Sequence, residues 1–377
     1  MTLSSRYIAL LFFTLSVAAH AQQIKIGNYT FPGGGEYQGE LVKGKPYGNG
    51  VTTFPNGDVH TGEYVKGKRQ GRGVYQFSDG EKYEGEWYQD QQHGKGVYYF
   101  ANNNRYEGLW FRDYQQGEGT MYYFNGDVYV GEWYMDKRQG HGTYTYSNGE
   151  SYDGEWKDDV KCGKGTFDWN DGNVFEGEWK NNMKNGKGVF RYSFGDVYSG
   201  DWVDDCQHGR GIYTFSDGDK YEGEYVKGQR TGEGVYTFAN GDRYVGHFLD
   251  GAQDGTGTFR WVNGAVYEGQ WKANSPNGHG KYTWANGDVY EGGWKDGAMD
   301  GEGVIRQADG VKFKGTFRAG KKEGKGIMED ADGVRYEGTF HNDLKDGDFE
   351  EKDKSGHLLR RVTYVKGMQK STTEASQ

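Results

Sequence analysis

Residues 221–243 read YEGEYVKGQRTGEGVYTFANGDR, and this 23-residue pattern recurs fourteen times without an insertion between residues 37 and 358. Numbered within one repeat, a ring stands at positions 1 and 5 in nearly every copy. Glycine holds positions 3 and 12 throughout, and positions 14 and 21 in all but one copy each. A fixed period of this length is typical of arrays in which each repeat stacks on its neighbours.

The composition follows from the repeat. The chain has 377 residues with 66 glycines but only 4 prolines, which excludes collagen and proline-rich linkers. Aromatic residues make up 16% of the chain, more than a disordered polymer would carry. The formal net charge of −10 argues against nonspecific binding of nucleic acid.

Each repeat reads as a β-hairpin. The segment Y-E-G-E-W alternates with period two, so rings and glycine share one face of a strand and acids share the other. A polar loop is expected over positions 7–12, a second strand over 15–18, and a tight turn at N-G-D. The predicted fold class is all-β, an elongated single-layer antiparallel sheet of stacked hairpins that advances about 9.5 Å per repeat.

We expect the rings and glycines of the repeats to be structural, because a lone hairpin is unstable and stacking buries its rings. In the middle repeats the expected packing rings are Tyr83, Trp87, Tyr106, Trp110, Tyr129, Trp133, Tyr152, Trp156, Phe175, Trp179, Tyr198 and Trp202. The matching structural glycines are Gly85, Gly94, Gly96, Gly177, Gly186 and Gly188.

Residues 1–21 have the pattern of a secretory signal peptide: Arg6, an apolar run, and Ala-His-Ala before a cleavage site between Ala21 and Gln22. This predicts export across the inner membrane to the periplasm, the cell surface or the medium. Residues 22–36 match the second half of a repeat and are expected to cap the array, followed by fourteen repeats over 37–358. Residues 359–377 are expected to form a charged cap with a disordered tail from 371, or an end that associates with another chain.

The consensus Y-E-G-E-W-x-x-x-x-x-x-G-x-G-x-Y-x-x-x-x-G-D closely resembles the MORN repeat (membrane occupation and recognition nexus), over about 85% of the chain. The resemblance implies a β-hairpin array that acts as a scaffold, in some relatives at membranes. It does not imply the catalytic domains that follow the motif elsewhere, because only 19 residues come after residue 358. Arrays of this kind with a signal peptide resemble bacterial envelope proteins.

We find no metal-binding, nucleotide-binding or nucleophile motif, and therefore expect no enzyme activity, cofactor or metal. The repeated acid at position 22 could suggest Ca²⁺, but copies about 9.5 Å apart cannot share one ion. Lys and Arg at positions 9 and 10 are expected on a solvated loop edge, with lipid headgroups as a further reading.

The leading hypothesis is a secreted, non-enzymatic scaffold that presents its sheet to a protein partner. The alternative is an envelope protein that binds a phospholipid headgroup or a glycan through exposed rings or the basic loop edge. Nucleic acid is not an expected partner, and self-association through one end of the array stays open.

A stacked array predicts an extended particle in solution. A compact globule of this length would have a radius of gyration near about 21 Å, whereas fourteen stacked repeats should give a clearly larger value. Small-angle scattering of the purified protein measures this directly, and a value close to the globular one would contradict the stack.

Overall fold

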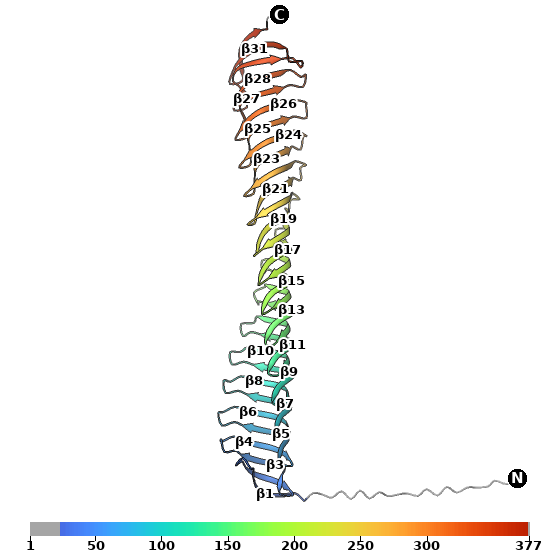
Figure 1. Cartoon of the computed structure of the whole chain (residues 1–377), viewed down its shortest axis with the longest axis vertical. Helices are drawn as coiled ribbons and strands as arrows, with labels where there is room; N and C mark the ends of the chain where they lie inside the picture. Colours follow the sequence, from blue (N-terminus) through green and yellow to red (C-terminus); the bar gives the residue numbers. More distant parts are fainter. Residues whose placement is uncertain (1–22, 376–377) are drawn as a thin grey trace, which may run out of the picture. The chain divides into compact units, whose positions relative to one another are not determined.

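The computed structural model describes residues 23–375, and within this range all regular structure is β-strand. The chain divides into two compact units, residues 1–142 and 143–377. In each unit the strands pair in chain order and antiparallel to their neighbours (Figure 1). The predicted all-β, antiparallel stack of hairpins is confirmed.

The strands alternate between seven and nine residues through most of the chain. The first unit holds β1 (Lys25–Thr30), β2 (Glu36–Val42), β3 (Lys45–Thr53), β4 (Val59–Val65), β5 (Lys68–Gln76), β6 (Lys82–Tyr88), β7 (Gln91–Tyr99), β8 (Arg105–Phe111), β9 (Tyr114–Tyr122), β10 (Val128–Tyr134) and most of β11 (Lys137–Thr145). The second unit holds β12 (Ser151–Lys157), β13 (Val160–Asp168), β14 (Val174–Lys180), β15 (Met183–Arg191), β16 (Val197–Val203), β17 (Cys206–Thr214), β18 (Lys220–Val226), β19 (Gln229–Thr237), β20 (Arg243–Leu249), β21 (Ala252–Arg260), β22 (Val266–Lys272), β23 (Ser275–Thr283), β24 (Val289–Lys295), β25 (Ala298–Arg306), β26 (Lys312–Arg318), β27 (Lys321–Glu329), β28 (Arg335–His341), β29 (Leu344–Lys345), β30 (Gly347–Lys352), β31 (Leu358–Val365) and β32 (Met368–Glu374).

The two strands of one repeat are joined by a two-residue turn at positions 7 and 8. In the repeat 175–197 this turn is Asn181 and Asn182, with φ of 52° and 67°, as a type I′ hairpin requires. The second strand therefore starts at position 9, and the expected polar loop over positions 7–12 is wrong. The glycine at position 12 explains the difference: Gly186 has φ 104° and forms a bulge that keeps positions 9–17 in one strand.

A three-residue turn joins one repeat to the next. In the repeat 221–243 the N–H of Gly241 donates to the carbonyl of Phe238 (2.9 Å), and the N–H of Phe238 donates to the carbonyl of Asp242 (2.9 Å). Gly241 has φ 93°, the left-handed conformation that ends a type I turn in this hairpin class. The ring at position 18 thus begins a turn and is not part of the second strand as expected.

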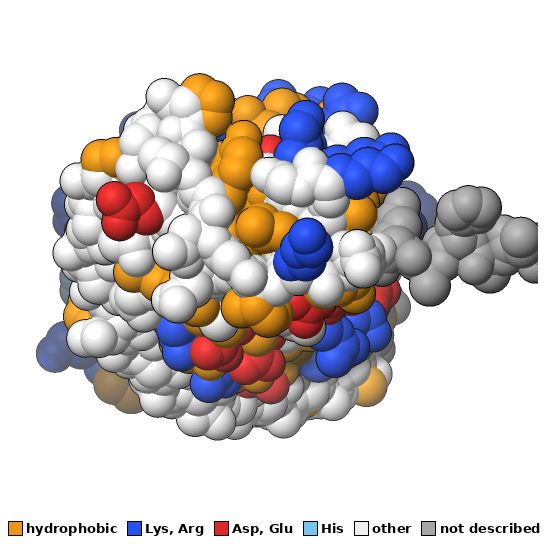
Figure 2. Space-filling model, turned by 90° about the horizontal axis from the view of Figure 1, so that it is seen from below, with side chains coloured by type: hydrophobic (Ala, Val, Ile, Leu, Met, Phe, Trp, Pro, Cys, Tyr) orange, Lys and Arg blue, Asp and Glu red, His pale blue; other side chains and the backbone are white. Residues whose placement is uncertain are grey.

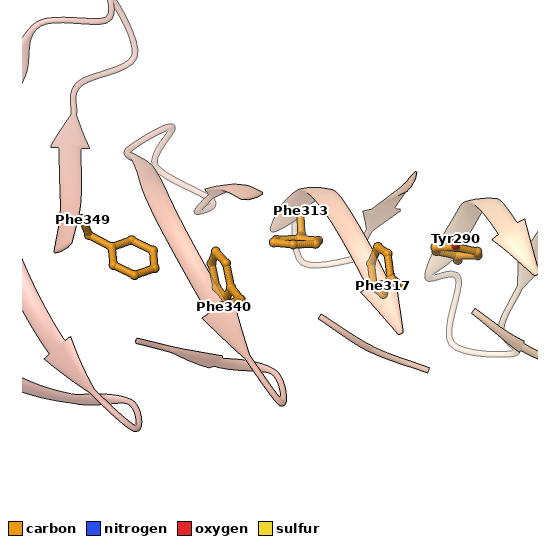
Figure 3. Packing of buried hydrophobic residues seen from close by; sticks show 5 residues of the cluster. All are labelled: Tyr290, Phe313, Phe317, Phe340 and Phe349. Carbon is orange, nitrogen blue, oxygen red and sulfur yellow. The ribbon is translucent and has the colours of Figure 1, made fainter. Parts of the chain in front are cut away.

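The core of each unit is a row of perpendicular rings. In most repeats the ring at position 1 lies edge-to-face between the position 5 rings of its own repeat and of the next, an arrangement favoured by the ring quadrupole. In the last repeat Phe349 takes this place against Phe340. Near the C-terminal end Phe313 contacts Phe317 (5.3 Å between centroids, 89°) and Phe340 (5.0 Å, 79°), as Figure 3 shows. The row is continuous within the unit because every ring serves two neighbours.

Paired glycines at positions 3 and 14 make room for these rings. Gly177 lies opposite Gly188 in the ladder, and the ring of Phe175 covers both. A Cβ atom at Gly177 would lie 2.6 Å from the Cα of Gly188 and 2.6 Å from the Cζ of Phe175. No side chain fits there without moving the backbone or the ring.

Hydrogen bonds between the turns tie each repeat to the next. Asp196, at position 22, accepts from the hydroxyl of Tyr213 (2.7 Å) and the N–H of Ser216 (2.8 Å) in the following repeat. At the other edge Asp205, at position 8, accepts from the N–H of Lys184 in the preceding repeat (2.8 Å). Successive repeats are thus joined by hydrogen bonds at both rows of turns.

Among the residues that the structure describes, β1 pairs with β2 alone, so the sheet is open at this end. Ile24 and Ile26 are exposed there, and seen from this end hydrophobic side chains reach the surface among charged ones (Figure 2). At the other end the predicted disordered tail over 371–377 is wrong as far as the structure describes it. Residues 368–374 form β32, which pairs with β31 across a two-residue turn at Lys366 and Gly367, both with positive φ.

Replacing Gly177 by Ala should lower the stability of the second unit by roughly 1–3 kcal/mol, as overpacking of a close contact does. Gly33→Ala is the matched control, because no atom lies within 4 Å of its Cβ position. The urea unfolding midpoint, followed by tryptophan fluorescence, reports the change. Equal midpoints for both variants would show that the ring does not depend on the glycine pair.

Candidate functional site

The face of the sheet opposite the rings carries positions 2, 4, 6, 13 and 15, and we call it the outer face. In the first unit the glycine columns thin the sheet and leave a groove of about 820 Å³ on this face. Smaller hollows of about 610 and 440 Å³ lie on the outer face of the second unit. The large groove is lined by Arg72, Val74, Glu84, Glu86, Lys95, Val97, Glu107, Leu109 and Glu118, together with glycine backbone.

Charges of both signs border this groove. Lys82 pairs with Glu84 (2.8 Å), and Arg105 pairs with Glu107 (3.1 Å). Both cations also lie over rings of the outer face, Lys82 over Tyr99 (4.3 Å) and Arg105 over Tyr122 (4.3 Å). The groove wall is therefore amphipathic, with ring faces and ion pairs side by side.

The acids at position 4 also hold the hairpin bulge. Glu63 accepts from the N–H of Arg72 (3.0 Å), and Glu132 accepts from the N–H of His141 (3.1 Å), each across the glycine at position 12. Gln270 does the same for His279 (2.8 Å), so an amide can replace the carboxylate in this role. These acids are structural, yet they leave negative charge on the outer face.

A stripe of exposed rings runs beside the groove at position 6 of three successive repeats. Tyr88, Phe111 and Tyr134 are 50%, 47% and 55% exposed, and we call them the outer stripe. His93 bridges the first two, with its ring centroid 5.5 Å from that of Tyr88 and 5.3 Å from that of Phe111. Tyr114, the cross-strand neighbour of Phe111, is also exposed. Four such half-exposed rings present on the order of 400 Å² of surface, the size of a functional patch.

The expected packing rings lie on the opposite, ring face. Buried side chains there include Tyr83, Trp87, Tyr106, Trp110, Tyr129, Trp133, Tyr152, Trp156, Phe175, Trp179, Tyr198 and Trp202. Among the glycines, Gly85 pairs with Gly96 and Gly177 with Gly188, whereas Gly94 and Gly186 have positive φ at the bulge. The predicted cleavage site at Ala21 and Gln22 lies outside the described residues.

The expected basic loop edge is wrong for position 10, whereas lysines at position 9 such as Lys68 and Lys137 are exposed beside the turn. Position 10 lies in a strand on the ring face, because the turn occupies only positions 7 and 8. Arg69 stacks over Trp87 (4.2 Å), Lys161 over Phe167 (4.4 Å) and Lys184 over Trp202 (4.8 Å). Burial lowers the pKa of Lys184. These cations cover ring faces and do not form a solvated row for headgroups.

The acids at position 22 are engaged in turns. Asp58 accepts from the hydroxyl of Tyr75 (2.7 Å) and the N–H of Ser78 (2.9 Å). Burial is the largest single influence on its pKa and raises it, but the hydrogen bonds together outweigh burial and leave the pKa lowered. Within residues 23–375 no three His, Cys, Asp or Glu side chains gather as a metal site would require. No helix of that range is long and apolar enough to span a bilayer.

The outer stripe was not among the residues singled out from the sequence. Its signal is visible in the alignment, because position 6 is aromatic in three successive repeats and Val, Leu, Lys, Arg or His elsewhere. Period-two alternation places position 6 on the face of positions 2 and 4. The sequence could not show which rings stay uncovered, since that depends on the two-residue turn.

The sequence model of the MORN repeat matches the chain in fourteen successive segments, thirteen of 23 residues from 37 to 335 and a last one over 336–347. A search of curated proteins found no significant match. Among solved structures, the TCP10c domain of Drosophila melanogaster Sas-4 is 14% identical and covers 41% of this chain and 93% of that chain, with a TM-score of 0.26. The TCP10 domain of Danio rerio CPAP is 10% identical and covers 77% and 99%, with a TM-score of 0.17. At these scores the likeness supports no conclusion.

One repeat departs from the others at position 1, where His60 replaces the usual Tyr or Phe. Its side chain is fully buried; Nδ1 bonds to the hydroxyl of Tyr64 (2.8 Å), whereas Nε2 has no partner among the described residues. Burial, helped by the charge of Arg69, lowers the pKa of His60 from 6.5 to about 3. The folded protein therefore holds this imidazole neutral.

His60 should make the first unit acid-sensitive. Below pH 6.5 the unfolded chain binds a proton that the folded chain refuses until about pH 3, so stability falls as the pH drops through this window. The loss should be roughly 2 kcal/mol between pH 7 and pH 5, and His60→Phe should remove it. Urea midpoints of both proteins at the two pH values test this, and an equal acid shift in both would contradict it.

Proposed function

The chain belongs to the MORN-repeat family of repeat scaffolds, and we propose that it is a secreted, non-enzymatic scaffold that docks a protein partner on the outer face of the first unit, over residues 83–142. The observation that carries the proposal is the outer stripe beside the large groove. Half-exposed rings near a groove are typical of protein interfaces, where aromatic anchors supply much of the binding energy.

The remaining chemistry of the array supports a binding role. Many of the acids that could serve in catalysis, at positions 4 and 22, are engaged by backbone N–H groups or tyrosine hydroxyls. The core tyrosines are held protonated, because burial raises the pKa of residues such as Tyr290 to about 12. Secretion is supported by the basic residue, apolar run and Ala-His-Ala of residues 1–21.

A glycan is the second candidate ligand. The rings of Tyr88 and Tyr134 stand beside the carboxylates of Glu86 and Glu132, and a flat ring next to a polar acceptor suits a sugar as well as a peptide. A phospholipid headgroup stays a further candidate ligand: the cations at position 10 stack on rings of the other face, but lysines at position 9 such as Lys68 and Lys137 are exposed.

Photo-cross-linking in the native cell tests the proposal. A benzoylphenylalanine at Phe111 should give one discrete protein adduct of defined mass. The matched control is the same probe at Phe194, a 62% exposed ring in a turn of the second unit. An adduct from both positions, or from neither, would speak against docking on the outer stripe, and an adduct with polysaccharide would favour the glycan.

A further inference from the structure

The outer stripe has a regular spacing that selects the conformation of its ligand. One ring projects from each repeat, and successive repeats are two strands, or about 9.5 Å, apart. The ring of His93 contacts the rings of both Tyr88 and Phe111, and its two centroid distances are compatible with a separation of this size between those two rings. A ligand that contacts all three rings must therefore present equivalent groups at about this interval.

A polyproline II helix meets this condition. It has three residues per turn and a rise of about 3.1 Å per residue, so residues i, i+3 and i+6 project from one side at intervals of about 9.3 Å. In a β-strand, residues three apart point to opposite faces, so a strand cannot use the same spacing. A polyproline II segment also loses little entropy on binding, because it is extended before it binds.

The residues next to the stripe indicate which kind of ligand side chain each ring would bind. At position 4, two residues before each ring on the same face, stand Glu86, Leu109 and Glu132. Each tyrosine of the stripe thus has a glutamate two residues before it on the same face, and the central phenylalanine has a leucine. A ligand cation bound at either tyrosine can form a cation–π contact with the ring and an ion pair with the glutamate. At Phe111 an apolar ligand side chain fits better.

A ligand cation is also disfavoured at the central ring, Phe111. The guanidinium of Arg112 already lies over Phe111, 5.1 Å from the ring centroid. A second positive charge there would meet like charge, whereas a leucine or proline would pack against Phe111, Leu109 and the cross-strand Tyr114. The residues at position 4 along the stripe are therefore acidic, apolar and acidic, and Lys137 stands across the two-residue turn from Tyr134.

Building on the proposed function, we propose that the partner's docking segment is a polyproline II stretch with a basic residue, an apolar residue and a basic residue at i, i+3 and i+6, bound along Tyr88, Phe111 and Tyr134. A second copy of this chain fits less well. If two copies paired face to face about a two-fold axis at Phe111, Glu86 of one copy would face Glu132 of the other, or each glutamate would face its own counterpart. In both cases acid would face acid, and the like charges would repel.

The test uses a fluorescein-labelled peptide of sequence RPPLPPR and the full chain, followed by fluorescence anisotropy. We expect saturable binding that weakens with added salt. Two control peptides test the charge and the spacing: EPPLPPE reverses the charge, and RPPLRPP moves only the second cation, from i+6 to i+4. Both should bind at least fivefold more weakly than RPPLPPR.

Variants locate the site. Phe111→Ala should weaken binding about tenfold, and the double variant Glu86→Gln with Glu132→Gln should weaken it several-fold and flatten its salt dependence. Glutamine keeps the fold, because Gln270 makes the same bulge bond to a backbone N–H. Phe194→Ala, in the second unit, should bind as well as the unchanged protein.

The outcomes separate this inference from the proposed function. No binding of RPPLPPR, equal binding of the control peptides, or full binding by Phe111→Ala would overturn the inference. If Phe111 nevertheless cross-links to a protein, the scaffold proposal stands and only the ligand class is wrong. A chitin oligosaccharide that binds in a Phe111-dependent manner, with no peptide binding, would overturn both in favour of a glycan.

Discussion

The close approach of a ring to two facing glycines is the contact on which the whole sheet depends. In the repeat 152–174, Tyr152 lies over Gly154 and Gly165, which face each other across the hairpin. Its hydroxyl donates to the carbonyl of Glu155 (3.1 Å), so the polar end of the ring is satisfied where it is buried. The ring then meets Trp156 and Trp179 edge-to-face, and this second contact joins one repeat to the next.

The glycines at positions 12 and 21 have a different role, because they supply backbone conformations with positive φ. Position 12 carries the bulge and position 21 the inter-repeat turn, both with positive φ, as at Gly186 and Gly241. The bulge shifts the register by two residues, so that the glycine at position 14 lies opposite the glycine at position 3. Position 10 pairs with position 5 because the turn occupies only positions 7 and 8, and this is why Arg69 and Lys184 cover rings.

The sequence predicted the features that depend on local periodicity. Alternation around Tyr83, Gly85 and Trp87 was enough to place rings on one face and acids on the other. It could not predict the bulge at position 12, since a glycine column is equally compatible with a loop, and the basic column was misplaced for that reason. Strand β32 was missed because its exposed polar residues resemble a tail, and only pairing with β31 orders them.

The separation of the two faces leaves the outer face free to change. Apart from Val42, which is buried, the residues at position 6 are exposed, so substitutions at these positions should cost the fold little. The column divides into blocks: aromatic at Tyr88, Phe111 and Tyr134, aliphatic at Val203, Val226 and Leu249, and basic at Lys272, Lys295 and Arg318. A single backbone template can in this way carry several chemically distinct recognition surfaces along one chain, each able to diversify independently of the others.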